Sequence, residues 1–115
     1  MAIIIRSDRF TNLFNINGIT LWPFIIINST ADDVTINHEK IHIAQQLEMW
    51  ILPFYIQYLL DYRKGLKVYS DLTPTSFKQL KSYAQIRFEQ EAYANETDFN
   101  YLKTRKRFSW KNYVI

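Results

Sequence analysis

Hydrophobic residues form two short runs near the start of the chain, ahead of any helical spacing. The first run, residues 2–5, is rich in isoleucine, and β-branched side chains favour extended backbone. The second run, residues 19–28, follows the turn signal Asn17-Gly18 and reads as a strand. Pro23 lies within it and cannot donate a hydrogen bond to a neighbouring strand, which leaves at least one free edge there. The sequence therefore predicts a small N-terminal β-sheet.

Helical spacing begins after a polar loop. We expect a helix to start at residues 33–35 and to continue to about Leu60. Pro53 should kink or interrupt this helix, because proline removes a donor and its ring crowds the preceding turn. The segment 63–65 is expected to end the helix, with Gly65 as a left-handed cap.

A second helical region follows. Residues 73–74, Thr-Pro, offer one helix start, and residues 76–79 offer another as a capping box. From there to about Lys106 the sequence favours helix, and the pattern allows a break near Gln85. A little β-structure followed by two to three helices predicts an α+β fold that is mainly helical.

The composition of the chain mainly excludes certain kinds of scaffold and functional site. The chain has 115 residues, 48% of them hydrophobic, and no repeat or low-complexity stretch divides it, so residues 1–115 are expected to form one domain. The absence of cysteine excludes a disulfide scaffold, a thiolate zinc site and a cysteine nucleophile. Two glycines are too few for a phosphate-binding glycine loop. The chain also has only two histidines, and they lie close together.

These two histidines form the motif His-Glu-x-x-His. On a helix, His38 and His42 lie one above the other, so both imidazoles can reach one ion. Glu39 lies between them and can act as general base on a metal-bound water, which zinc makes acidic enough to lose a proton near neutral pH. The motif therefore predicts a zinc site with Glu39 as the catalytic residue.

A catalytic zinc usually has three protein ligands, and the chain has no third histidine. In the extended motif HExxHxxGxxH the third ligand would fall at Glu48. Gln45 stands where that motif has glycine, so the helix should continue and carry Glu48 about 9 Å along the axis from His42. Glu48 is therefore expected to be solvated or to support a ligand, and the third ligand is sought in residues 88–98.

The motif at residues 38–42 and the stretch at residues 88–96 together resemble the gluzincin metallopeptidases. The resemblance is closest to the small single-domain minigluzincins. Residues 38–46 are also similar to a group of small bacterial proteins that carry HExxHxxQQ. The resemblance implies a minimal zincin-like fold and a zinc-dependent metallopeptidase that hydrolyses peptide bonds with one Zn²⁺ ion, acting on a peptide or protein substrate.

The same resemblance implies the remaining site residues. Glu91 is the expected third ligand, on a helix downstream of the motif. Asn95, four residues later, would orient a ligand histidine, and Asp98, one turn further, could share that role. Glu89 and Glu96 are the alternatives to Glu91, with surface charge as their simpler interpretation.

Zincins hold extended substrates along a strand edge. The strand immediately upstream of the motif is the natural candidate, namely Phe24, Ile25, Ile26, Ile27 and Asn28; a purely structural edge strand is an equal alternative. The electrophilic residue expected opposite Glu39 has four candidates, namely Tyr83, Tyr93, Tyr101 and Tyr113.

An alternative interpretation keeps the zinc but not the catalysis. The segment from Met49 to Leu60 is strongly apolar, yet at about 12 residues it is too short to span a membrane. It could contact a membrane peripherally, or a partner, together with the basic C-terminal end, Lys103, Arg105, Lys106, Arg107 and Lys111. A latent enzyme is a further alternative, in which the aromatic tail, residues 108–115, covers the cleft.

The cellular location and the absence of a nucleic-acid partner are inferred from motifs that the sequence lacks. The N-terminus has no secretory signal pattern, so a cytoplasmic protein is expected. No nucleic-acid-binding motif accompanies the basic residues, so no nucleic-acid partner is expected.

Overall fold

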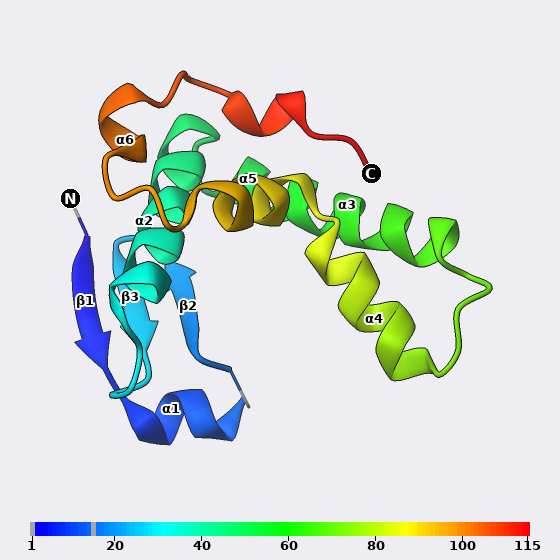
Figure 1. Cartoon of the computed structure of the whole chain (residues 1–115), viewed down its shortest axis with the longest axis horizontal. Helices are drawn as coiled ribbons and strands as arrows, with labels where there is room; N and C mark the ends of the chain where they lie inside the picture. Colours follow the sequence, from blue (N-terminus) through cyan, green and yellow to red (C-terminus); the bar gives the residue numbers. More distant parts are fainter. Residues whose placement is uncertain (1, 15) are drawn as a thin grey trace.

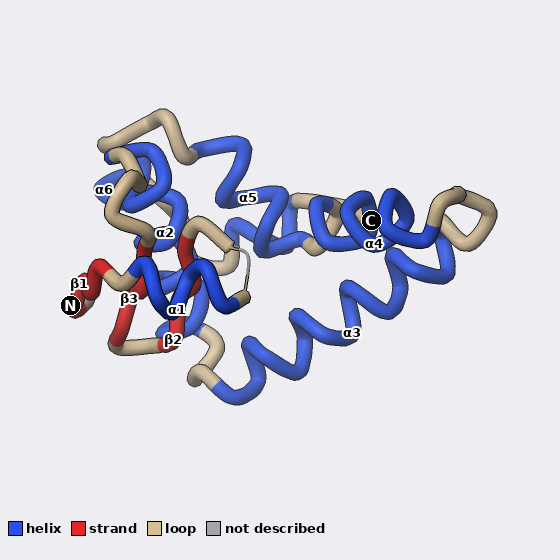
Figure 2. The backbone as a smooth tube through the Cα atoms, turned by 90° about the horizontal axis from the view of Figure 1, so that it is seen from below, coloured by secondary structure: helices blue, strands red, loops and turns tan. Residues whose placement is uncertain are grey.

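The computed structural model describes residues 2–14 and 16–115 (Figure 1). A small sheet and helix α2 form one end of the molecule, and helices α3 and α4 extend from it as a hairpin (Figures 1 and 2). The predicted α+β fold, mainly helical, is confirmed, although the helices are shorter and more numerous than expected. In chain order the elements are β1 (Ile3–Arg6), α1 (Asp8–Leu13), β2 (Gly18–Leu21), β3 (Phe24–Ile27), α2 (Asp33–Glu48), α3 (Leu52–Val68), α4 (Thr75–Ala84), α5 (Arg87–Asn95), α6 (Tyr101–Thr104) and a 3-10 helix, η1 (Ser109–Asn112).

The run at residues 19–28 is a β-hairpin rather than a single strand. β2 and β3 pair antiparallel, and Trp22 and Pro23 form the turn between them. β1 pairs in parallel with the other side of β3, so the strand order is β1-β3-β2. The prediction that residues 24–28 form an edge strand is therefore wrong, because β3 is the middle strand. The edge beside the helices belongs to β2.

Two buried clusters hold the helices against the sheet and against one another. The first joins β3 to α2 and contains Ile25, Ile27 and Ile43. The second lies among α3, α5 and the C-terminal segment and contains Phe54, Ile86, Phe88 and Trp110. The motif helix α2 is thus fixed against the sheet, while α5 is fixed by residues from the last part of the chain.

The long helix expected up to Leu60 is two helices. α2 ends at Glu48, and α3 starts at Leu52 with Pro53 in its first turn. Proline is well suited to that position, because the first turn of a helix has no intrahelical acceptor for its missing N–H. Trp50 and Ile51 make the connection with φ angles of 61° and 62°, in the left-handed region. The predicted interruption at Pro53 is therefore confirmed, and Pro53 starts the second helix rather than kinking a continuous one.

Gly65 does not end α3, as the sequence predicted, but lies inside it, and the helix continues to Val68. A Cβ atom on Gly65 would lie 3.0 Å from the Cα of Ser82 on α4, and Ser82 is fully buried. Glycine is thus required here for the close crossing of two helices and not for a left-handed cap. The predicted break near Gln85 is confirmed, because α4 ends at Ala84 and α5 begins at Arg87.

A buried ion pair links α3 to the start of α5. Asp61 is 2% exposed, and both its oxygens accept from the guanidinium group of Arg87 at 2.9 Å. It also accepts from Gln57 Nε2 at 2.7 Å and from the main-chain nitrogen of Arg87 at 3.2 Å. The carboxylate therefore fixes the position at which α5 begins.

Gly65→Ala is expected to lower the free energy of unfolding by about 1–3 kcal/mol, because the added methyl group crowds the backbone of α4. In an open helix the same change would raise it by about 1 kcal/mol. Urea unfolding measures the difference. Lys64→Ala, at the neighbouring exposed position, is the control and should stay within about 0.5 kcal/mol of wild type. A Gly65→Ala variant as stable as wild type would contradict the close crossing.

Asp61→Asn is expected to weaken the acid dependence of stability. Burial raises the pKa of Asp61, but its hydrogen bonds to Arg87 and Gln57 outweigh burial and lower it. A carboxylate with a lowered pKa stabilises the fold above its unfolded pKa of about 3.9, and this contribution disappears as the pH falls through the folded pKa. Between about pH 5 and pH 2, wild type should therefore lose more stability than the variant in urea unfolding. Equal losses would contradict this role for Asp61.

Candidate metal centre

The two motif histidines lie one turn apart on the same side of α2. His38 is 7% exposed and His42 is 5% exposed, and their Nε2 atoms are 3.2 Å apart. Their rings meet edge to face with centroids 4.8 Å apart. The helical spacing predicted by the sequence therefore brings two potential ligand atoms together.

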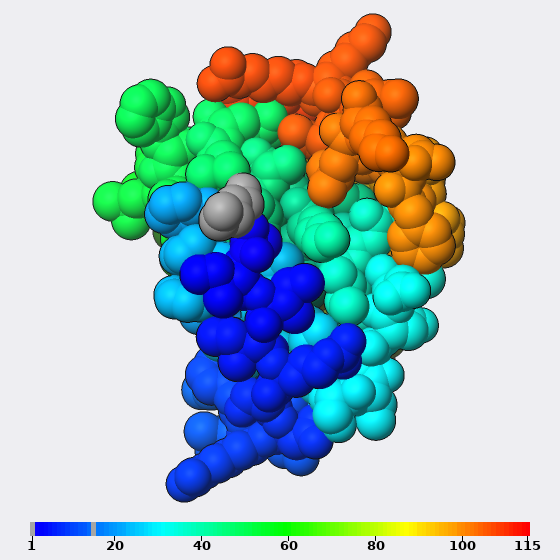
Figure 3. Space-filling model, turned by 90° about the vertical axis from the view of Figure 1, so that its left-hand side faces the viewer, coloured from blue at the N-terminus to red at the C-terminus, as the bar shows by residue number. Residues whose placement is uncertain are grey.

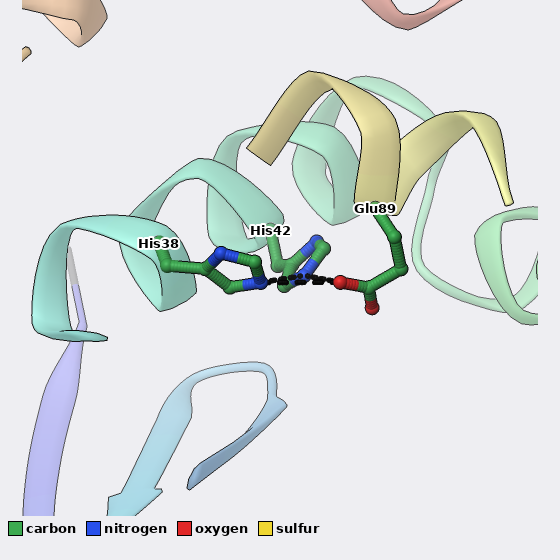
Figure 4. A group of neighbouring side chains, drawn as sticks. All are labelled: His38, His42 and Glu89. Carbon is green, nitrogen blue, oxygen red and sulfur yellow. Dashed lines mark hydrogen bonds and ion pairs between the residues drawn. The ribbon is translucent and has the colours of Figure 1, made fainter. Parts of the chain in front are cut away.

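Glu89 of α5 completes a group of three ligand atoms (Figure 4). Its Oε1 lies 3.1 Å from His38 Nε2 and 3.2 Å from His42 Nε2. In a tetrahedral zinc site with bonds of about 2.0–2.1 Å, neighbouring ligand atoms are about 3.3–3.4 Å apart. The three atoms are thus spaced almost as the ligands of one small metal ion would be, so the residues present fit such an ion.

The structure does not bring Glu91, the expected third ligand, to the histidines. Successive residues of an α-helix are rotated by about 100°, so Glu89 and Glu91 point to nearly opposite sides of α5. Glu91 is fully buried on the other side, where it forms an ion pair with Arg105 and accepts a 2.6 Å hydrogen bond from Tyr101 Oη. The prediction of Glu91 as the third ligand is therefore wrong, and Glu89, which is 3% exposed rather than a surface charge, is the carboxylate that could hold an ion together with the histidines.

Arg105 connects the side of α5 that carries Glu91 to the end of α2. Its guanidinium group also bonds both oxygens of Glu48, at 2.6 and 3.1 Å. Burial raises the pKa of Glu91, but the hydrogen bonds from Arg105, Tyr101 and Gln45 lower it by more. Glu91 is therefore an ionised carboxylate, and Glu48 is its buried companion rather than a solvated acid.

Gln45 connects this ion cluster to the histidines. Its amide nitrogen donates to Phe88 O at 3.0 Å and to Glu91 Oε1 at 2.9 Å, so its oxygen must face His42 Nδ1, 2.7 Å away. An amide oxygen only accepts, so Nδ1 of His42 carries a proton, and in the neutral ring the lone pair is therefore on Nε2. Glu91 thus acts on the site through Gln45, by fixing the tautomer of His42.

His38 is oriented in the same way by Glu96. The Nδ1 of His38 lies 3.0 Å from Glu96 Oε1, which leaves Nε2 directed at the ligand group. The residues expected in this role do not contact a histidine: Asn95 donates to Glu91 O at 2.8 Å, and the carboxylate of Asp98 accepts from the main-chain nitrogen of Asn100. The orienting role implied for Asn95 and Asp98 thus falls to Glu96.

Glu89 is held by a tyrosine on its other oxygen. Tyr58 of α3 donates to Glu89 Oε2 at 2.6 Å, so Oε1 alone faces the imidazoles. Burial and the charge of Glu89 raise the pKa of Tyr58 far above its ordinary value, so this hydroxyl remains a donor. Burial lowers the pKa of His42, but the charge of Glu89 and the hydrogen bond to it raise that pKa to about 9. A protonated His42 therefore balances the charge of Glu89.

A cavity of about 280 Å³ adjoins the ligand group. Glu39, His42 and Glu89 line it together with the edge strand β2 and aromatic residues of α3 and α4. Glu39 is 7% exposed, and its Oε2 accepts from the hydroxyl of Thr20 at 2.6 Å. The strand next to Glu39 is therefore β2, residues 18–21, and not the predicted residues 24–28.

The four candidate tyrosines differ in their position relative to the cavity and Glu39. Tyr83 lines the cavity, and the ring of Tyr93 packs against His38 with centroids 4.6 Å apart. Tyr101 is bonded to Glu91, and Tyr113 accepts from Asn95 at 3.3 Å. Tyr83 alone of the four lines the cavity beside Glu39.

The C-terminal tail does not cover this cavity. Among the described residues, none beyond Glu89 lines it. Trp110 is 3% exposed and packs on Phe88, with ring centroids 4.6 Å apart, and Gln90 Nε2 donates to Val114 O at 2.9 Å. The expectation of a cleft-blocking tail is therefore wrong, because its aromatic residues contribute to the core.

The sequence offered Glu89 and Glu96 only as alternatives to Glu91, and it did not indicate Tyr58 or the bridging role of Gln45. The spacing of Glu89 and Glu96, seven residues or about two turns, was a usable signal, because it places both on one side of α5. Tyr58 had no comparable signal, since its place depends on how α3 packs against α5.

Glu89→Gln and Glu91→Gln are expected to have opposite effects. Glu89→Gln should weaken zinc binding by about 10-fold or more and leave the fold intact, because an amide is a poor zinc ligand. Glu91→Gln should retain zinc but lower the free energy of unfolding by about 1–3 kcal/mol, because Arg105 loses a buried charged partner. Chelator competition and urea unfolding measure the two quantities. Loss of zinc in Glu91→Gln alone would reverse the assignment.

Comparisons with models of known families, with curated proteins and with solved structures give no match to this chain.

Proposed function

We propose that the protein is a zinc-dependent metallopeptidase that hydrolyses peptide bonds in a peptide or protein substrate. The observation that supports this most strongly is the spacing of His38 Nε2, His42 Nε2 and Glu89 Oε1, all within 3.1–3.2 Å of one another. Glu39 lines the same cavity as two of these ligands. A metal site with an acid-base group beside it in a cavity is suited to hydrolysis.

In this proposal some residues bind the zinc ion and another transfers protons. His38, His42 and Glu89 would hold the zinc, which when bound supplies Lewis-acid chemistry by polarising a carbonyl group and acidifying water. Glu39 would take a proton from the attacking water and give it to the leaving nitrogen. The hydroxyl of Thr20 occupies Glu39 Oε2, which leaves Oε1 to receive that proton.

The free edge of β2 would position the substrate. Because Asn17 O accepts from Asn28 N, alternation along β2 directs the main-chain groups of Gly18 and Thr20 away from β3. Thr20 O is already occupied by Gln46 Nε2 at 3.0 Å and by Tyr55 Oη at 3.3 Å. An extended peptide could therefore pair with β2 over a short length only, at Gly18 and the N–H of Thr20.

Tyr83 is the proposed donor to the carbonyl oxygen that becomes negative during the reaction. Burial and the charge of Glu89 raise its pKa well above the ordinary value, so it keeps its proton and can donate a hydrogen bond. The zincin-like fold is part of the same proposal. It is supported by the packing of the motif helix against a mixed sheet, in which the edge strand β2 runs antiparallel to β3.

Glu39→Gln is expected to retain one zinc ion per chain and to reduce cleavage of a casein-type substrate by about 10²–10⁴-fold, because proton transfer is lost while the ligands remain. Zinc content and initial rates measure the two effects. Asp98→Asn, the same acid-to-amide change at an exposed position, is the control and should leave the rate unchanged. Full activity in Glu39→Gln would exclude this mechanism.

A further inference from the structure

The outer face of α3 is apolar and unpartnered over its first half. It is formed by Leu52, Ile56, Leu59 and Leu60, which are 53–67% exposed. Their spacing of four, three and one residues places them on one side of the helix. The opposite side packs inward through Phe54 and Gly65. Folding thus buries one side of α3 and leaves four large aliphatic side chains in water.

Trp50 extends this apolar surface beyond the start of α3. It is 83% exposed and lies in the left-handed turn before the helix. Figure 3 shows the segment that leads into α3, in green, protruding beside the light-blue β2–β3 turn, and Trp22 N donates to Gln46 Oε1 at 3.0 Å, which ties that turn to the end of α2. The backbone at Trp50 is strained, and its exposed side chain adds no packing energy to the isolated chain. These two features together point to a partner outside the chain.

The second half of the same side is cationic. Arg63, Lys64 and Lys67 are exposed, and Arg63 and Lys67 continue the line of the apolar residues. Within α3, which the structure describes throughout, the one acidic residue is Asp61, and it is buried against Arg87. The solvent-facing side of α3 therefore carries positive charge without compensating acids.

We propose that the outer face of α3, together with Trp50, docks on the surface of an anionic lipid bilayer. The apolar half and the tryptophan would enter the boundary between headgroups and acyl chains, where tryptophan is favoured. Arg63 and Lys67 would reach the lipid phosphates with their long side chains. Because apolar and cationic residues follow one another along one line, α3 would lie tilted, with its N-terminal end deeper.

The membrane contact is peripheral. No helix among residues 2–14 and 16–115 is long and apolar enough to cross a membrane. The predicted basic C-terminal end has one cation fewer than its sequence indicates, because Arg105 is buried between Glu48 and Glu91. The lipid contact is therefore assigned to α3.

A bilayer suits this surface better than a second copy of the chain. Two copies that met through α3 would bring like charges together, and each chain has a net charge of +3. An anionic bilayer offers the opposite charge and an apolar layer at the same place. This proposal does not depend on peptidase activity, because none of its residues holds the metal.

Vesicle flotation tests the apolar half. The full-length protein should float with vesicles of phosphatidylcholine containing about 30% phosphatidylserine, and much less with phosphatidylcholine alone. Leu59→Glu should reduce binding by about 10-fold or more, because a charge enters the apolar layer. Leu13→Glu, the same change at a position 75% exposed on α1, should bind as wild type does. Equal binding by the two variants, or no flotation of wild type, would overturn the proposal.

A second pair of variants tests the cations. Arg63→Gln with Lys67→Gln should reduce binding to the anionic vesicles by about fivefold for each charge removed. Arg9→Gln with Lys40→Gln removes the same charge from exposed positions outside α3 and should have little effect. Equal losses in the two double variants would show attraction by net charge alone and would contradict a specific face. Sedimentation showing dimers that Leu59→Glu dissociates, without vesicle binding, would identify a second copy as the occupant and overturn the proposal as well.

Discussion

The candidate metal centre depends on the rotation of α5 about its own axis relative to α2. That rotation is fixed by Arg105, which bonds Glu48 at the end of α2 and Glu91 in the middle of α5. With Glu91 held on that side, Glu89 must face the opposite side, where the two histidines lie. A rotation of α5 by half a turn would exchange the two glutamates and remove the ligand group.

This arrangement places a costly group of charges in the interior. Burying an arginine and two carboxylates carries a desolvation penalty that their attraction offsets only when the geometry is good and the remaining polar atoms are bonded. Here Tyr101, Gln45 and the main-chain nitrogen of Phe108 satisfy further carboxylate oxygens. Apolar residues could fill the same volume, but they could not fix the amide of Gln45 and, through it, the tautomer of His42. The ion cluster therefore orients the groups around His42 as well as joining α2 to α5.

The part of the site that was predictable from the sequence is local. The helical spacing of His38 and His42 depends on one helix, and the structure places them as that spacing requires. The choice between Glu89 and Glu91 depends on which side of α5 meets α2, and this is decided by Arg105, about 15 residues away. The fold shows the same difference between local and long-range effects. The α+β class was predictable from local periodicity, whereas the role of Gly65 depends on Ser82 in another helix. Pro23 is compatible both with an edge strand and with a turn, and pairing on both sides of β3 selects the turn.

The position of Trp110 in the core has a consequence for the order in which the molecule can assemble. The motif histidines are synthesised before α5, and α5 is packed against Trp110 and held in its rotation by Arg105. Both of these residues come after α5 in the chain. During synthesis, the two histidines therefore have no fixed carboxylate neighbour until residues 105–110 have been made and packed. The group formed by His38, His42 and Glu89 is consequently assembled only after these later residues have packed against α5.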